Sequence, residues 1–568
     1  MGRFLGAKER RGAGGLSVSA MGVPIVIRQR SSPWSHLANA DAGGDEESKV
    51  DVKRYMVEGA LHTRQYAQMY FVRLARARKR IMQEAASSSG KKEGNTSAYG
   101  LRNENGSSNE ACFRTLLQCA DQGSMEKTSS VVIGTIYKEQ RMKPNILNDY
   151  MKGSLLQGGT GNGYHSVGVM LEQMKLIDAD TDTVIIEDES ARMKLVMDDS
   201  IDKDDASLEL HKLVTGVVVA ACGYVNEEDG CFHATKISFV RPSPQRRPPN
   251  VNIDNSSRME VDEETPESRD PHVVLVSGLD IGESDQLKVQ LLMDFLTGNA
   301  GSEEDTKLCS SIVRVIVAGG TICLRESFRD AIKTENSSVP SNGNDTRESL
   351  KLKLREVDVV LSELASSIPI DIMPGEGEPT NHNLPQQPFH TMLLPGISQF
   401  LLGDDSEDND SATIDTVRLS TNPHCFSEHG VSFIGTSGQN INDVYRYSSL
   451  EDRLDILTHT LLWGCIAPTA PDTLPCYPIA NADVFEIDEW PDIYFSGMMN
   501  EFGSRLITLN HENNEICIKA DDVANNEGQD RISRTRVICV PHFGKTGTVA
   551  LVNLRTLECS PIIFDVSE

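Results

Sequence analysis

Three apolar runs with glycine turns decide the fold of the second half of this chain: "HVVLVSGLDIG" at 272–282, "IVRVIVAGGTI" at 312–322 and "IPIDIMPG" at 368–375. Apolar runs of this length, rich in β-branched residues, are typical of strands that are buried on both faces. Segments with helical spacing stand between them, at 286–298 and 353–367. Strands that alternate with helices predict an α/β sandwich, which we place at residues 271–568.

A different pattern precedes this sandwich. Between residues 128 and 245, turn-forming residues such as "EDES" and "NEEDG" separate five β-rich segments: "VVIGTIYK", "DTVIIED", "ARMKLVM", "KLVTGVVVAACGYV" and "ATKISFV". Five short strands predict a five-stranded OB-type β-barrel, so the fold class is α+β multidomain. OB barrels often stack bases on exposed rings beside a basic groove. We expect the rings here, Tyr137, Tyr224, Phe232 and Phe239, to fill the barrel instead.

Polar stretches rich in Gly, Ser or Pro divide the chain further. The predicted parts are a disordered leader at 1–50, an amphipathic helical segment at 51–86, a mostly polar linker at 87–127, a second linker at 246–270, and polar insertions near 333–350 and 403–415.

The helical segment contains "TRQYAQMYFVRLARARKRIM" at 63–82. Its apolar stripe, at steps of four, four, three and four, is Tyr66, Tyr70, Leu74, Ala77 and Ile81. Its other face carries Arg64, Arg73, Arg76, Lys79 and Arg80. A basic face could contact phosphates or an acidic partner, but runs of this kind are usually solvated, and we favour the solvated reading.

Composition narrows the classes of function. The 568 residues carry 55 Lys and Arg against 83 Asp and Glu, a net charge of −28, which disfavours tight, autonomous binding to DNA. The 12 cysteines include no CxxC pair, so we expect free thiols and no zinc ribbon. With no apolar run of about 18 residues and no apolar signal core, we expect a soluble intracellular protein.

Four turns follow the buried strands of the sandwich: "VSGLDIG", "VAGGTIC", "MPGEGEPTN" and "FSGMMNEFGS". Their layout resembles the calcineurin-like metallophosphoesterases, whose turns read DxH, GDxxD, GNH[DE] and GHxH and hold two metals. The resemblance assigns the first turn to Gly278 and Asp280 and the second to Gly319 and Gly320. It assigns the remaining turns to Gly375, Glu376, Gly377, Glu378, Gly497, Met498 and Asn500.

The metal ligands of that family are largely missing here. Gly320 stands where the family has its bridging Asp, and the last turn has lost both His residues. The oxygen donors that remain are Asp280, Glu376, Glu378 and Asn500, with no imidazole among them. We therefore expect no metal, no cofactor and no catalytic residue in this domain. His390 and His424 lack partners at metal spacing, so we expect packing or hydrogen-bonding roles for them.

A silent phosphoesterase domain after an OB-like barrel is similar to the B-subunit family of eukaryotic replicative DNA polymerases. Within this family, the chain most resembles the delta-type small subunits, and the resemblance extends from about Tyr55 to the C-terminus. The runs that carry it are "RQYAQMYFVRL", "VSGLDIGE", "PIDIMPGEGEPTNHNLPQQPFH", "TNPHCF", "GTSGQNINDVYRYSSLEDRLDIL" and "APTAPDTLPCYP". The resemblance implies a nuclear, non-catalytic subunit with two partners: the cysteine-rich C-terminal domain of the catalytic subunit and a third, clamp-binding subunit. The sliding clamp and DNA would be reached indirectly, and no membrane is involved.

Two segments are composed like docking elements. The polar run "SGQNINDVYRY" contains Gln439, Asn440, Tyr445, Arg446 and Tyr447, and suits either a partner-docking loop or a self-satisfied turn. The run "TAPDTLPCYP" has three prolines in ten residues, which suits a rigid surface element with or without a partner.

Other functions stay open at this point. They are a phosphodiesterase or nuclease that retains activity through unusual ligands, a single-strand binder that acts through the barrel, and a small subunit of the alpha or epsilon polymerase.

Overall fold

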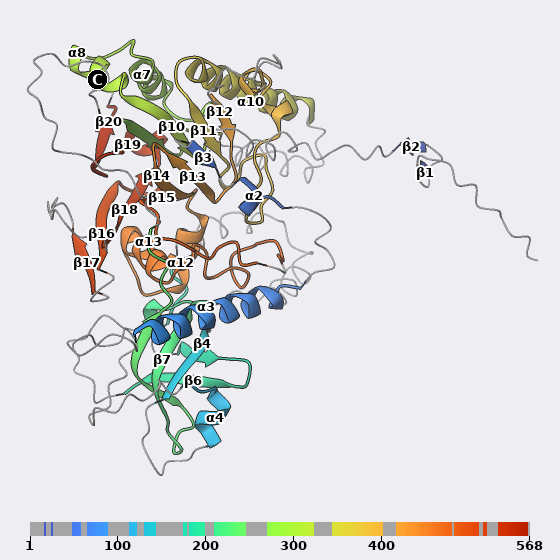
Figure 1. Ribbon diagram of the computed structural model, residues 1–568. Helices are drawn as coiled ribbons and strands as arrows, with labels where there is room; N and C mark the ends of the chain where they lie inside the picture. Colours follow the sequence, from blue (N-terminus) through green and yellow to red (C-terminus); the bar gives the residue numbers. More distant parts are fainter. Residues whose placement is uncertain are drawn as a thin grey trace, which may run out of the picture. The chain divides into compact units, whose positions relative to one another are not determined.

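The computed structural model (Figure 1) describes residues 16–18, 24–26, 48–50, 52–57, 65–88, 113–121, 130–143, 174–178, 181–198, 210–245, 270–322, 343–401, 416–479, 482–510, 515–519 and 532–565. By internal contacts the chain divides into Met1–Gly44 and Asp45–Glu568. In the first unit, β1 (Leu16–Val18) pairs antiparallel with β2 (Pro24–Val26). Everything below concerns the second unit.

Two sheets form the sandwich. The six-stranded sheet has the order β12-β11-β10-β9-β19-β20. Its strands are β9 (His272–Val276), β10 (Ile312–Ala318), β11 (Ile370–Met373), β12 (Val417–Leu419), β19 (Thr548–Asn553) and β20 (Cys559–Ile563). Strands β12, β11, β10 and β9 run parallel to one another, so their carboxyl ends meet at one edge of the sheet.

The seven-stranded sheet has the order β17-β16-β18-β15-β14-β13-β3. Its strands are β3 (Ser48–Val50), β13 (His424–Glu428), β14 (Val431–Thr436), β15 (Ile493–Met499), β16 (Gly503–Asn510), β17 (Glu515–Lys519) and β18 (Ile532–Pro541). Strands β14, β15 and β18 are parallel. The edge strand β3 comes from the predicted leader, so the end of that leader is part of the sheet.

Successive side chains of each strand point to opposite faces of its sheet, and apolar residues on both faces allow four layers: helices, two sheets and helices. Val273 and Leu275 of β9 share an apolar cluster with Phe433 and Phe495 of the other sheet, which places that cluster between the two sheets. The opposite face of the first sheet packs on α7 (Gln286–Leu296), α8 (Glu303–Cys309) and α10 (Gly343–Ala365). The outer face of the second packs on α12 (Gln439–Tyr447) and α13 (Arg453–Leu462). Figure 1 displays this order of helices, sheets and helices.

The barrel precedes the sandwich along the chain. Strands β4 (Ser130–Glu139), β5 (Thr183–Glu187), β6 (Arg192–Met197), β7 (Val218–Val225) and β8 (Phe232–Phe239) form a closed barrel in the order β4-β5-β6-β8-β7. Each of the five segments predicted to be a strand contains one of them. The parallel pairing of β6 with β8 closes the barrel, while its other pairs are antiparallel.

Two helices flank the barrel, α3 (Ala67–Ser88) and α4 (Leu116–Asp121), whereas the short helix α2 (Val52–Tyr55) contacts β13 of the sandwich. On α3, Leu74, Ala77 and Ile81 are buried as predicted, whereas Tyr66 of the same predicted stripe precedes the helix and is exposed. The solvated reading of the basic face is wrong for Arg73, which is only 4% exposed. Three arginines of α3 are bound to carboxylates of the sandwich, as described below.

Several predicted parts lie wholly or partly outside the described residues. These are most of the leader at 1–50, most of the linkers at 87–127 and 246–270, and most of the insertions near 333–350 and 403–415. One correction is visible: α10 begins at Gly343, inside the first predicted insertion. Within the ranges described above, no helix combines the length and the apolar character needed to cross a bilayer.

Candidate functional site

The carboxyl ends of the parallel strands bring the predicted turns together. Gly278 follows β9, Gly319 and Gly320 follow β10, and Gly375 follows β11. A Cβ atom on Gly375 would lie 2.8 Å from the amide nitrogen of Gly320, so these turns are in direct backbone contact. The sequence-predicted positions therefore form one cluster, which we call the turn cluster.

The side chain of Met498 lies against Gly320, the position that the resemblance assigns to a bridging Asp. A Cβ atom on Gly320 would lie 2.5 Å from Met498 Sδ and 2.7 Å from Gly278 Cα, closer than real Cβ contacts allow. Gly320 also has φ +69°, a left-handed conformation that glycine adopts without strain. Gly497 and Met498 belong to strand β15, so the turn predicted there begins later, after Met499. Ser277 holds this end of β15, because its hydroxyl oxygen accepts the N–H of Met498 at 2.7 Å.

Glu378 is turned inward onto the backbone of two turns. Its carboxylate accepts N–H groups from Thr321 at 2.7 Å, Ile322 at 3.0 Å and Gly320 at 3.3 Å, and one from Gly375. Burial raises the pKa of Glu378 to about 7, against the four N–H donors, which favour the ionised form. The carboxylate therefore ties the β10 and β11 turns together and has few lone pairs left for another ligand.

Neutral amides fill the neighbouring part of the cluster. The Nδ2 group of Asn422 donates to Gln386 Oε1 at 2.9 Å, Ser437 Oγ at 2.6 Å and Gln439 Oε1 at 3.0 Å. Gln439 donates in turn to Gln386 Oε1 at 2.8 Å, and Gln386 donates to the carbonyl of Gly375 at 3.0 Å. The network joins the ends of β11, β12 and β14 without a charged group.

Asp280 has an imidazole partner that the sequence reasoning did not count. His542 follows β18 directly, and its Nε2 lies 2.9 Å from Asp280 Oδ2. The His542 ring also fills the space beside Gly278, where a Cβ atom would lie 2.7 Å from Cγ of the ring. The expectation that no imidazole lies near these turns is therefore wrong. Inspection of a fifth strand end, after "RVICV", would have found it.

The other predicted oxygen donors are Glu376 and Asn500, and both are exposed. Gly377 lies in the turn after β11, whereas Gly497 lies within β15, where a Cβ atom would be 2.2 Å from the carbonyl oxygen of Ala318. Over the part of the chain that the structure describes, no group of three or more His, Cys, Asp or Glu side chains is arranged to hold a metal ion.

His424 belongs to a buried network of ion pairs that joins β10 and β11 of one sheet to β13 of the other. Its Nε2 is 3.0 Å from Asp371 Oδ2, while Arg314 donates to Asp371 at 2.8 Å and to Glu428 at 2.9 Å. Burial alone would raise the pKa of Asp371, but the cations Arg314 and Arg418 hold it well below its usual range. The predicted hydrogen-bonding role of His424 is thus confirmed. His390 likewise accepts the N–H of Met392 at 3.2 Å.

The predicted docking residues lie on α12, so their segment is a helix and not a loop. Gln439 belongs to the amide network, the Nδ2 group of Asn440 donates to Ile466 O at 2.7 Å, and Tyr447 is buried. Tyr445 stacks under the guanidinium of Arg453, 3.4 Å from the ring centroid. The carbonyl of Arg446 accepts the N–H of Leu176 at 2.7 Å. A partner role for these residues stays a prediction.

The aromatic rings of the barrel have mixed positions. Phe232 fills the interior, and Phe239 packs against Trp463 of the sandwich at 6.4 Å between centroids. Tyr137 is covered by Arg192, and Tyr224 stacks on His233. Expecting all four rings inside the barrel was therefore too simple, since only Phe232 is fully buried.

Comparison with known proteins gives the family. Residues 273–504 match the B-subunit family of DNA polymerases alpha and epsilon, and residues 65–237 match the DNA polymerase delta subunit OB-fold domain. The DNA polymerase delta small subunit of Oryza sativa is 32% identical over 447 residues, covering 78% of this chain and 86% of the relative. That of Arabidopsis thaliana is 33% identical over 448 residues, covering 78% and 84%.

An animal relative gives the same result. The DNA polymerase delta subunit 2 of Drosophila melanogaster is 34% identical over 437 residues, covering 77% of this chain and 83% of the relative. In all three comparisons the identity extends along most of the relative's own length. The chain therefore belongs to the family of DNA polymerase delta small subunits.

Proposed function

We propose that this chain is the non-catalytic accessory subunit of DNA polymerase delta, and that its sandwich is a calcineurin-like phosphoesterase fold without a working site. The observation that carries the loss of catalysis is the position of Met498, whose sulfur occupies the space beside Gly320. Two-metal hydrolysis needs a carboxylate that bridges both ions, and that position has neither the residue nor the room.

The donors that remain are committed elsewhere. Glu378 accepts backbone N–H groups, and Asp280 pairs with His542. The Asn422 network offers uncharged amide and hydroxyl groups, which are weak ligands for the divalent cations of hydrolases compared with carboxylates and imidazoles. The turn cluster is therefore best understood as a structural junction between strand ends, with no cofactor.

Hydrolysis assays test this loss of activity. We expect the purified chain to leave bis(4-nitrophenyl) phosphate and single-stranded DNA intact in the presence of Mn²⁺ or Mg²⁺. A trace of hydrolysis that is equal in the wild type and in Asp280→Ala marks a contaminant. Metal-dependent hydrolysis that Asp280→Ala abolishes would contradict the proposal.

The assembly role is supported by the family and by the charge of the chain. A net charge of −28 favours protein partners over bare DNA, so we propose that the subunit joins two others. One is the cysteine-rich C-terminal domain of the catalytic subunit. The other is the third subunit, which would lead to the sliding clamp and thereby to DNA. Replication and repair synthesis place the complex in the nucleus.

The docking residues proposed on α12 fall into two groups. Tyr445 and Arg446 are half-buried and keep surface that a partner could contact. Gln439, Asn440 and Tyr447 would support them from within, through the contacts described above. Co-expression with the catalytic subunit and size-exclusion chromatography test the assembly, and we expect one co-eluting complex. Separate elution at micromolar concentration would contradict the proposed role.

A further inference from the structure

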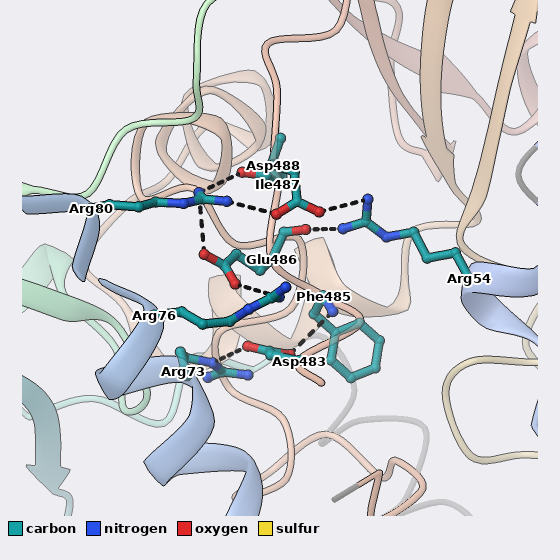
Figure 2. Close-up of polar contacts among 9 residues, drawn as sticks. All are labelled: Arg54, Arg73, Arg76, Arg80, Asp483, Phe485, Glu486, Ile487 and Asp488. Carbon is teal, nitrogen blue, oxygen red and sulfur yellow. Dashed lines mark hydrogen bonds and ion pairs between the residues drawn. The ribbon is translucent and has the colours of Figure 1, made fainter. Parts of the chain in front are cut away.

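Helix α3 makes two unlike contacts. Its residues Leu74, Ala77 and Ile81 pack on apolar residues of the barrel strands, among them Val131 and Val218. The adjacent side of the helix carries arginines toward the sandwich segment Asp483–Asp488 (Figure 2). The contact with the barrel strands is thus apolar, and the contact with the sandwich is ionic.

Arg73 is the buried centre of the ionic contact. Its Nε donates to Asp483 Oδ2 at 2.5 Å, and both side chains are nearly or fully buried. The same guanidinium donates to the carbonyls of Gly216 at 3.1 Å, Pro468 at 3.0 Å and Ala470 at 3.4 Å. One side chain therefore joins α3, a barrel loop and two segments of the sandwich. Thr469 and Ala470, which begin the proline-rich run "TAPDTLPCYP", are accordingly buried, whereas Pro475 further along the run is exposed.

Three further arginines surround the remaining carboxylates, as Figure 2 shows. Arg76 and Arg80 bind the two oxygens of Glu486 at 2.9 and 3.2 Å. Arg80 also binds Asp488 at 2.6 Å, and Arg54 binds Asp488 at 3.2 Å from the other side. We call these four arginines, with Asp483, Glu486 and Asp488, the arginine clasp.

A second polar contact lies across the same junction. Lys138 of β4 is 1% exposed, and its Nζ donates at 3.0 Å to the carbonyls of His211 and Tyr447. Tyr447 is the last residue of α12, where a cation is favoured by the helix dipole. The barrel side thus also reaches the sandwich through polar contacts outside the clasp, and the ion pair of Lys143 with Asp472 is another of them.

We propose that the arginine clasp sets the position of the barrel and α3 on the sandwich, and that the partner subunit recognises this position. The inference rests on the proposed assembly role. Apolar contacts are non-directional, so they hold two surfaces together without fixing their register. Charge-assisted hydrogen bonds from planar guanidinium groups are directional and do fix it. A partner that contacts both parts would then bind more weakly when the register is lost.

The test uses the double variant Glu486→Gln/Asp488→Asn in the full chain. These substitutions remove the negative charges of the two less buried carboxylates of the clasp and keep the size of their side chains. Arg73, Asp483 and the apolar side of α3 stay intact, so folding is expected. The matched control is Glu189→Gln, which removes an ion pair of similar length between Arg78 of the same helix and a barrel turn. Hydrogen exchange of the amides at Phe485 and Ile487 reports the order of the clasp segment, because they flank Glu486. The Phe485 N–H donates to Asp483 Oδ1 at 3.1 Å, and the Ile487 N–H donates to the carbonyl of Gly464 at 2.8 Å.

We expect exchange at these amides to rise about tenfold in the double variant, and to rise with salt in the wild type only. Affinity for the C-terminal domain of the catalytic subunit should fall by about the same factor. The control should change neither quantity. Unchanged exchange in the double variant contradicts the clasp, and raised exchange with unchanged affinity contradicts its role in recognition. If the wild type fails to bind at all, the proposed function fails, while the exchange data still decide the clasp.

Discussion

The turn cluster and the arginine clasp each join segments that are distant in the sequence, but they do so with opposite chemistry. At the turn cluster, neutral amides, a methionine sulfur and an inward-turned Glu378 fill the space between the strand ends. At the clasp, four arginines meet three carboxylates. Charged side chains are thus few at the turn cluster and concentrated at the clasp, where two parts of the chain meet. This contrast agrees with the proposed role of a non-catalytic accessory subunit.

The largest expected change in the free energy of unfolding comes from substitution of Arg73, in the clasp. Arg73→Met leaves Asp483 buried without its partner, and breaking a buried ion pair typically costs about 3–5 kcal/mol. The free energy of unfolding in urea should fall by that amount. Arg78→Met removes only the half-exposed pair with Glu189 and should cost less than about 1 kcal/mol. Equal losses in the two variants would mean that Arg73 has no special place in the fold.

Restoring the missing carboxylate should weaken the turn cluster. Gly320→Asp adds left-handed strain of about 1–2 kcal/mol and overpacking of about 1–3 kcal/mol against Met498. Gly230→Asp is the matched control, because Gly230 has φ +67° but nothing within 4 Å of its would-be Cβ atom. The difference between the two variants, measured by urea unfolding, isolates the crowding. Stabilisation of Gly320→Asp by Mn²⁺ would instead reveal a site that the metal can rebuild.

Substitution of Glu378, in the turn cluster, should have a smaller effect on stability, and this effect should depend on pH. Since its pKa is about 7 in the folded chain and 4.5 in the reference state, the folded state binds more protons between these values. The contribution of this group is therefore lost as pH rises from about 5 to about 7, and stability should decline over that window. Glu378→Gln should remove this part of the decline, whereas the exposed Glu376→Gln should keep it. Identical pH profiles for all three proteins would count against the assigned role.

The same contrast explains what could be predicted from the sequence. The strands at 272–276, 312–318 and 370–373 and their glycine turns are local patterns, so they could be predicted, together with the missing ligands at Gly320 and Met498. His542 obeys the same strand-end rule but lies far along the chain from Asp280. The clasp could not be predicted, because Arg76 and Glu486 are 410 residues apart and neither has a local pattern that names the other.

The chain belongs to the delta small subunits, and we propose that it binds the catalytic subunit of the delta polymerase and no other. The most direct measurement is a competition in which the tagged full chain meets equal amounts of the C-terminal domains of the delta, alpha and epsilon catalytic subunits, and the captured domain is identified by mass spectrometry. We predict capture of the delta domain alone. Preferential capture of the alpha or epsilon domain, or of none, would contradict the account.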